Sequence, residues 1–144
     1  MANFATLPRP VLLVEDNPVD IDLTQRAFAR QKLTNPIQVA RNGEEALAYI
    51  PRWQAGETTP LLALLDLKLP RVGGLEVLAG WKADPASRSI PVVVLSSSAE
   101  DNDIQAAYRL GANSYIVKPV DFAKFLEVAA QIELYWCALN EVPQ

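Results

Sequence analysis

The chain has 144 residues, about the length of one domain. Half of the residues are apolar and 21% are charged, which is typical of a folded globular domain and excludes an intrinsically disordered chain. The net charge is −4 and Lys and Arg are not clustered, so we expect no nucleic-acid partner. The chain has no histidine and one cysteine, Cys137, which excludes histidine-based catalysis and an internal disulfide.

The chain shows neither a secretory signal nor a membrane span. Residues 1–10 lack a charged start followed by an apolar run. The longest apolar runs, 61–65 and 134–139, are far shorter than the roughly 20 residues that cross a bilayer. We therefore expect one cytoplasmic domain over 1–144, without a membrane partner, with an N-terminal extension over 1–8 and a C-terminal tail over 134–144.

In the first half of the chain, short apolar runs alternate with segments of helical period. The apolar runs predict strands over 11–14, 37–40 and 61–65. A helix is predicted over 18–31, with Asn17 as its N-cap and Pro18 at its first position. A second helix is predicted over 44–50 and is expected to end at Pro51, so that 51–60 forms a long surface loop.

The second half repeats this alternation. Strands are predicted over 91–95 and 114–117, and helices over 74–83, 100–110 and from 121 towards 139. Gly111 follows the fourth helix and is expected in the left-handed conformation. Strands that alternate with helices form parallel βαβ units with right-handed crossovers. The pattern predicts an α/β fold with a doubly wound, five-stranded parallel sheet and helices on both faces.

Chemically distinctive residues follow four of the predicted strands. The residues are Glu15, Asp16, Asp66, Ser96 and Lys118. In an open parallel sheet, ligands bind beyond the carboxyl ends of the strands. We therefore expect three acids, one hydroxyl and one lysine to meet at one edge of the sheet.

This set of groups suits phosphoryl chemistry. Three adjacent carboxylates repel one another and favour a hard divalent cation such as Mg²⁺, Mn²⁺ or Ca²⁺. A carboxylate beside such an ion and a lysine can attack a phosphoryl group, since both cations neutralise the phosphoryl oxygens. A neighbouring hydroxyl can then hydrogen-bond the group that has been transferred. The sequence thus contains every part of a phosphoaspartate site.

Each residue also has a plain structural interpretation. Glu15 and Asp16 could only favour a helix start, and Asp66 could cap a turn. Ser96 could cap the fourth helix, and Lys118 could be a solvated turn residue. Tyr115 could be a core aromatic.

Four motifs carry a family resemblance: Val11–Pro18, Leu64–Pro70, Val94–Ser96 and Tyr115–Pro119. In this order and spacing they resemble the receiver domain of two-component response regulators, over about residues 9–135. More narrowly, the chain is similar to the small response regulators of cyanobacterial phytochromes. That similarity depends on the loop at 51–60, on residues 69–71 and on an aromatic tail at 132–136.

The resemblance implies a flavodoxin-like receiver fold with strand order 2-1-3-4-5. It implies that Asp66 is the phosphoacceptor and that Glu15, Asp16, Asp66 and the backbone carbonyl of Lys68 bind Mg²⁺, with Mn²⁺ as an alternative. Ser96 and Lys118 would contact the phosphoryl group, and Ser96 and Tyr115 would act as switch residues. The donor would be a sensor histidine kinase, by the narrower similarity a phytochrome. Gly73-Gly74 replaces the usual Asp-Gly, which alters a surface turn.

The residues at the strand ends distinguish between several possible functions. The leading hypothesis is a phosphoacceptor signalling protein, not an enzyme, that is a single-domain response regulator with output through its own surface. An unphosphorylated receiver-like interaction module is the alternative. A phosphatase with an aspartyl nucleophile needs a second Asp where Lys68 stands, and a flavodoxin-like electron carrier would have its phosphate repelled by Glu15 and Asp16.

The C-terminal part predicts a homodimer. One stripe of the last helix is apolar and suffices to cover the sheet: Phe122, Phe125, Leu126, Ala129, Ile132 and Trp136. Leu134, Tyr135 and Leu139 are left over, and extra apolar area of this kind favours an interface between two copies. Switching of Tyr115 would couple phosphorylation to that interface.

Overall fold

The computed structural model describes residues 9–119 and 121–139, the last three by their backbone alone. Its strands form one parallel sheet in the order β2-β1-β3-β4-β5, which confirms the expected doubly wound, flavodoxin-like order. The strands are β1 (Val11–Val14), β2 (Ile37–Ala40), β3 (Leu62–Leu65), β4 (Val92–Ser96) and β5 (Ser114–Val117).

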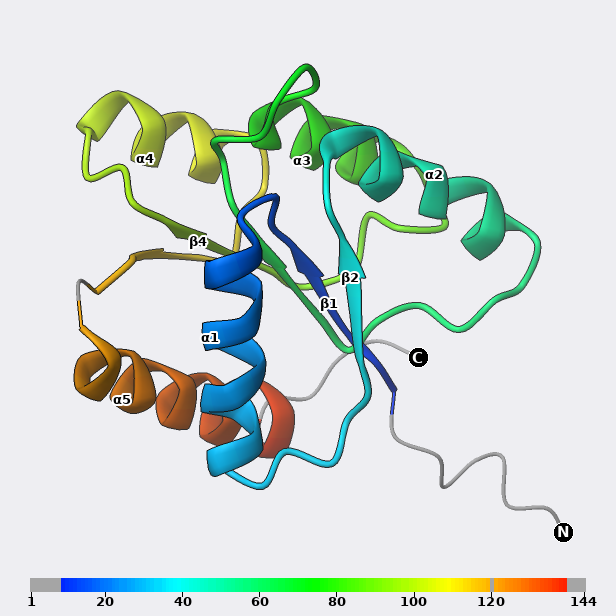
Figure 1. The fold of residues 1–144 in the computed structure, drawn as a ribbon. Helices are drawn as coiled ribbons and strands as arrows, with labels where there is room; N and C mark the ends of the chain where they lie inside the picture. The colour runs from blue at the N-terminus through cyan, green and yellow to red at the C-terminus, as the bar shows by residue number, and fades with distance from the viewer. Residues whose placement is uncertain (1–8, 120, 140–144) are drawn as a thin grey trace, which may run out of the picture.

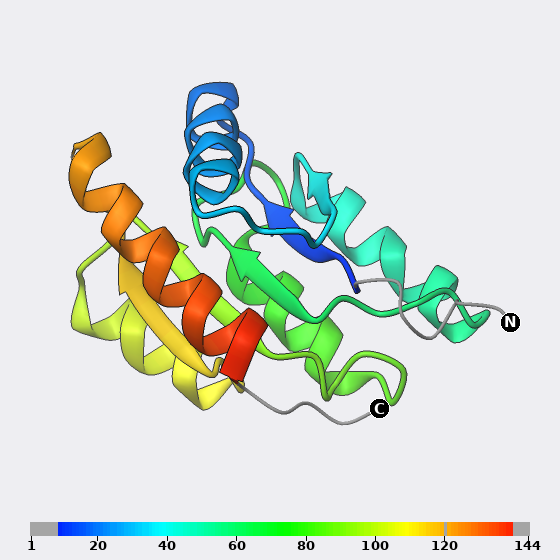
Figure 2. The ribbon, with the colours of Figure 1, turned by 90° about the horizontal axis from the view of Figure 1, so that it is seen from below.

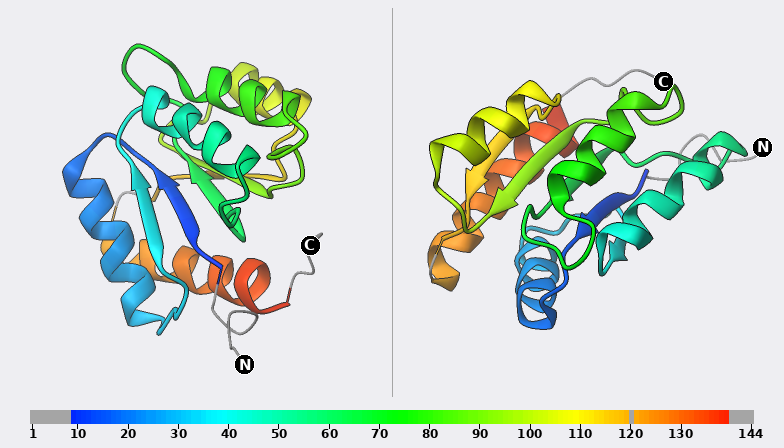
Figure 3. Two further views of the ribbon diagram at one scale, coloured as in Figure 1. Left: turned by 90° about the vertical axis from the view of Figure 1, so that its right-hand side faces the viewer. Right: turned by 90° about the horizontal axis from the view of Figure 1, so that it is seen from above.

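Helices cover both faces of the sheet (Figure 1). They are α1 (Pro18–Arg30), α2 (Gly43–Gln54), α3 (Gly74–Ala83), α4 (Asp101–Arg109) and α5 (Phe122–Ile132). Helices α1 and α5 lie on one face, and α2, α3 and α4 lie on the other (Figures 2 and 3). Side chains of β1 alternate between the two cores: Val11 and Leu13 face α1 and α5, and Leu12 and Val14 face the other layer.

Helix α1 begins as the sequence predicts. Pro18 occupies the first turn, and the Asn17 side chain accepts hydrogen bonds from the backbone N–H groups of Val19, at 2.8 Å, and Asp20, at 3.3 Å. This cap satisfies two donors that a helix start otherwise leaves unpaired. The first turn of α1 is therefore fixed directly beside the end of β1.

Helix α2 differs from its prediction, because it continues through Pro51 to Gln54. The added turn buries Trp53, whose ring stacks on Tyr49 at 5.5 Å and meets Trp81 edge-on at 5.8 Å between centroids. Such aromatic packing outweighs the hydrogen bond that the proline removes. The expected ending at Pro51 is wrong, and the surface loop begins after residue 54.

The last helix is also different from its prediction in one respect. Regular α-helix ends at Ile132, and a π-helical segment, Glu133–Leu139, follows it. The predicted stripe does cover the sheet: Phe125, Ala129 and Ile132 are buried, and Phe122, Leu126 and Trp136 pack against them. Leu134 and Tyr135 are 56% and 53% exposed.

Three expectations lie wholly or partly outside the described residues. The extension over 1–8, the end of the tail over 134–144 and the side chain of Leu139 belong to this group. Within 9–119 and 121–139, none of the helices has both the length and the apolar character needed to cross a membrane.

Candidate functional site

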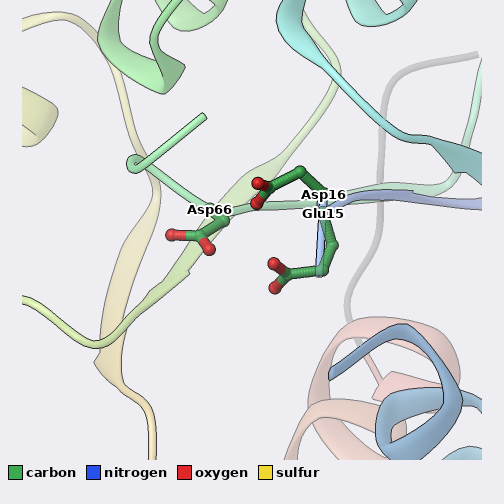
Figure 4. A group of neighbouring side chains, drawn as sticks. All are labelled: Glu15, Asp16 and Asp66. Atoms are coloured by element: carbon green, nitrogen blue, oxygen red, sulfur yellow. The ribbon is translucent and has the colours of Figure 1, made fainter. Parts of the chain in front are cut away.

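Three carboxylates meet at the carboxyl edge of the sheet. Each of Glu15, Asp16 and Asp66 offers an oxygen, and these oxygens lie within 4.8 Å of one another (Figure 4). Glu15 and Asp66 are 3% and 7% exposed, whereas Asp16 is exposed. The predicted group of acids is therefore present, with two of its members desolvated.

The sheet register brings these acids together. Val14 at the end of β1 pairs with Leu65 at the end of β3, so the residues that follow both strands are neighbours. The backbone continues this pairing, because the Asp66 N–H donates to the Val14 carbonyl at 3.1 Å. The Asn17 N–H donates to the Glu15 carboxylate at 3.3 Å and orients it beside the start of α1.

Lys118 supplies the positive charge of the site. Its Nζ donates to the carboxylates of Glu15 at 2.6 Å, Asp20 at 3.0 Å and Asp66 at 3.2 Å. The Lys118 N–H also donates to the Ser96 carbonyl at 2.8 Å, which fixes the backbone of the turn after β5. Lys118 is therefore a largely buried ion-pair partner and not a solvated turn residue, with its side chain 13% exposed.

The pKa values of both Glu15 and Lys118 are raised, for different reasons. Burial raises the pKa of Glu15 to about 7, although the hydrogen bond from Lys118 acts against this rise. Burial alone would lower the pKa of Lys118, but the hydrogen bonds to Glu15 and Asp20 outweigh it and raise that pKa. Four acids, Glu15, Asp16, Asp20 and Asp66, surround the single positive charge of Lys118. This excess of negative charge favours binding of a further cation.

Asp20 is a site residue that the sequence analysis missed. It lies in the first turn of α1, one helical turn after Asp16, and it reaches Lys118 across the end of β1. The available signal was the spacing of four residues between two acids at a helix start. Unless the position of Lys118 is known, this spacing cannot be told apart from the acidic residues that commonly stabilise the N-terminus of a helix.

Ser96 is fully buried at the end of β4. Its Oγ accepts a hydrogen bond from the Ser98 N–H at 3.3 Å. The serine that contacts the start of α4 is Ser98, whose Oγ accepts from the Glu100 N–H and donates to Asp103 at 2.5 Å. Ser96 is thus free of a helix-capping role.

Tyr115 lies on β5 beside the loop that follows Ser96, and its role as a switch residue stays a prediction. Its ring is partly buried against the core on the α2–α4 face. Its hydroxyl donates to the Ser98 carbonyl at 2.9 Å, so the ring is connected to the loop that follows Ser96. A rearrangement of that loop would therefore be transmitted directly to Tyr115.

The loop after β3 holds the Asp66 side chain. The Lys68 N–H donates to Asp66 Oδ1 at 3.2 Å, and the Gly74 N–H donates to the Leu67 carbonyl at 2.9 Å. A Cβ added at Gly74 would lie 2.3 Å from the Asp66 carbonyl oxygen, so this position of the Gly73-Gly74 pair requires glycine. Gly74 thus packs directly against the backbone of Asp66, whereas a Cβ at Gly73, the position that departs from the usual Asp-Gly, would meet its nearest atom at 3.9 Å.

The geometry suits a hard divalent cation and a phosphoryl group. All three donors of the cluster are carboxylate oxygens, which match Mg²⁺ or Mn²⁺. Two acids of this cluster, Glu15 and Asp66, also contact Lys118, so carboxylate oxygens lie beside both the lysine and the group that fits a metal ion. No contact of the Lys68 carbonyl tests its role as a ligand, which stays a prediction.

Comparisons with known proteins agree with this geometry. Residues 11–130 match the model of the response regulator receiver domain. A probable methanogenesis regulatory protein, FilR2, of Methanothrix harundinacea is 41% identical over 137 residues, covering 94% of this chain and 88% of that protein. Response regulator Rcp1 of Synechocystis sp. is 33% identical over 145 residues, covering 99% of both.

Solved structures give the same result. The phosphorylated cyanobacterial phytochrome response regulator RcpA is 39% identical, with a TM-score of 0.88 over 95% of this chain and 99% of that one. The Mn²⁺-bound form of Rcp1 has a TM-score of 0.86, covering 95% of this chain and 100% of that one. The narrower likeness to phytochrome response regulators is thus confirmed, and the chain belongs to the family of response regulator receiver domains.

Proposed function

We propose that this receiver domain accepts a phosphoryl group on Asp66 from a histidine kinase of a two-component system. One Asp66 oxygen attacks phosphorus, the phosphorus–nitrogen bond of the phosphohistidine breaks, and its electron pair leaves with the imidazole. The product is an acyl phosphate on Asp66. The supporting observation is the position of Asp66, 3.2 Å from Lys118 Nζ and within the group of three carboxylates. The protein would act as a signalling protein and not as an enzyme for external substrates.

Receiver domains bind Mg²⁺ in this acidic pocket, and the oxygen donors here fit that ion or Mn²⁺. Glu15, Asp16, Asp66 and the Lys68 carbonyl would hold it, and the bound ion would neutralise charge on the phosphoryl oxygens. Lys118 would pair with one of these oxygens. Ser96 would turn its hydroxyl towards another, and Tyr115 would follow the movement of the loop as the second switch residue.

Acetyl phosphate tests the acceptor directly. Wild-type protein incubated with acetyl phosphate and Mg²⁺ should gain one phosphoryl group in an intact-mass spectrum, and EDTA should abolish the gain. Asp66→Asn should gain no phosphoryl group. Asp22→Asn, which removes the same charge from an exposed position on α1, should be labelled as the wild type is. Labelling of Asp66→Asn would place the acceptor elsewhere, and no labelling of any form would favour the unphosphorylated interaction module.

We further propose a phytochrome as the kinase, because RcpA, which is 39% identical to this chain, is a cyanobacterial phytochrome response regulator. The docking surface would be α1 beside the site, where Val19 is 73% exposed and a groove is lined by Leu23, Arg26 and Phe122. Rates of transfer to Asp66 from purified light-regulated and unrelated kinases decide this. Equal rates would refute the assignment.

We also propose a homodimer formed through the C-terminal part. The supporting observation is the exposure of Leu134 and Tyr135, with Tyr135 packed edge-on against Trp136 at 5.0 Å between centroids. Analytical ultracentrifugation should show a dimer at micromolar concentration. Tyr135→Ala combined with Trp136→Ala should weaken it, and a wild-type monomer with and without phosphorylation would refute it.

A further inference from the structure

Lys118 has one ion-pair partner that does not belong to the metal-binding group. Its Nζ contacts three acids, and two of them, Glu15 and Asp66, are members of that group. The third, Asp20, lies 3.0 Å away on α1, with its side chain 33% exposed. Asp20 therefore contacts the lysine from the side of the site that faces α1.

The first two partners change when the site is loaded. A divalent ion withdraws negative charge from the carboxylates of Glu15 and Asp66. Phosphorylation converts one Asp66 oxygen into the bridging oxygen of an acyl phosphate, which is a weaker acceptor. A lysine side chain has several rotatable bonds, and its ammonium is strongly hydrated, so weakened ion pairs favour its departure into solvent until a phosphoryl oxygen is in place to pair with it.

Asp20 is not a member of the metal-binding group, and its backbone is held in the first turn of α1. Its N–H donates to the Asn17 cap, and its carbonyl accepts the hydroxyl of buried Thr24 at 2.8 Å. The carboxylate is thus presented from a fixed helical turn. We infer that Asp20 is a positioning residue for phosphoryl transfer, which keeps Lys118 Nζ at the acceptor while metal and phosphoryl group occupy the other acids. This inference rests on the proposed phosphorylation of Asp66.

The sign of the effect separates positioning from simple charge. Glu15, Asp16, Asp20 and Asp66 form an acidic pocket around one lysine. If Asp20 acted only through its charge, its removal would ease the approach of an anionic phosphoryl donor and speed phosphorylation. If Asp20 positions Lys118, its removal slows phosphorylation.

The experiment compares rates of phosphorylation by acetyl phosphate at saturating Mg²⁺. Asp20→Ala should lower the rate about fivefold, or about 1 kcal/mol in activation free energy, and Asp20→Asn, which retains an acceptor oxygen, should lower it less. Asp22→Asn is the matched control, because Asp22 lies on the same helix and pairs with exposed Arg26 at 2.9 Å. In a Lys118→Met background, Asp20→Ala should cause no further loss. An unchanged or higher rate in Asp20→Ala with Lys118 present would overturn the inference.

A second readout needs no phosphorylation. Acetic anhydride modifies free amines, so we expect Mg²⁺-loaded Asp20→Ala to be acetylated at Lys118 several-fold faster than the wild type and Asp22→Asn. Titration calorimetry should show Mg²⁺ affinity equal to or above that of the wild type, because Asp20 lies outside the metal-binding group. Equal acetylation in Asp20→Ala and wild type refutes the positioning of Lys118, whereas faster acetylation without any phosphorylation of Asp66 refutes only the proposed function.

Discussion

Replacement of Asp16 by Asn should stabilise the metal-free protein. Within the part of the chain that the structure describes, the Asp16 side chain has neither an ion-pair partner nor a hydrogen bond. Its carboxylate has two acidic neighbours, Glu15 and Asp66, at no more than 4.8 Å. The substitution therefore removes repulsion and keeps the size of the side chain.

The size of the effect follows from Coulomb's law. Asp16 is exposed, so the dielectric constant of water applies, and two unit charges 4.8 Å apart then repel by about 0.9 kcal/mol. Two neighbours give about 1.7 kcal/mol, and attraction to nearby Lys118 offsets part of it. A net gain of about 1 kcal/mol corresponds to a rise of about 3–4 °C in Tm for a domain of this size.

Differential scanning calorimetry at pH 8, where Glu15 is ionised, measures this gain with EDTA present. Adding Mg²⁺ should raise Tm more in the wild type than in Asp16→Asn, because the variant lacks one charged ligand. Asp22→Asn should leave Tm nearly unchanged. A metal-free Tm of Asp16→Asn at or below that of the wild type would refute the repulsion argument, and an equal response to Mg²⁺ would exclude Asp16 from the metal site.

Three further outcomes are expected. Gly74→Ala should destabilise the fold by about 1–3 kcal/mol in urea denaturation, because the added Cβ would lie 2.3 Å from the Asp66 carbonyl oxygen. Gly73→Ala should be tolerated, because its Cβ would have its nearest contact at 3.9 Å. The raised pKa of Glu15 means that the folded protein binds a proton more tightly than the unfolded chain does. The free energy of unfolding without metal should therefore fall as the pH rises from about 4.5 to about 7. Glu15→Gln should remove this decrease. Tyr115→Phe should cost about 0.5–1.5 kcal/mol in the same urea assay, since it loses a hydrogen bond at 2.9 Å.

Each of these expectations has a result that contradicts it. Similar losses in Gly74→Ala and Gly73→Ala would show that the loop yields to a Cβ. A Glu15→Gln protein whose stability falls between pH 4.5 and pH 7 as much as that of the wild type would show that Glu15 does not cause the decrease. A Tyr115→Phe protein as stable as the wild type would show that its hydroxyl bond is exchanged for water without loss.

Local signals predicted most of the fold and of the site. Asn17 and Pro18 specify the start of α1 because capping and the fixed φ of proline act within one turn. Glu15, Asp66 and Lys118 could be placed together because parallel strands all deliver their carboxyl ends to one edge. Each of these inferences needs only the strand pattern and neighbouring residues.

The features that escaped prediction depend on contacts between distant segments. Helix α2 continues past Pro51 because Trp53 packs on Trp81 of α3, a contact that no pattern within residues 44–54 reveals. Asp20 joins the site only through Lys118, 98 residues later in the chain. Non-local packing and non-local ion pairs thus account for both omissions.

The order of the site residues along the chain has a consequence for synthesis. A ribosome releases Glu15, Asp16 and Asp66 first, and Lys118 emerges 52 residues after Asp66 and 103 after Glu15. Strands β1 and β3, which carry the acids, are sheet neighbours and could pair as soon as both have emerged. At that stage the nascent half-sheet would hold three mutually repelling carboxylates without their lysine. A divalent cation in the cell would then be the available counterion for the growing chain until β5 is added.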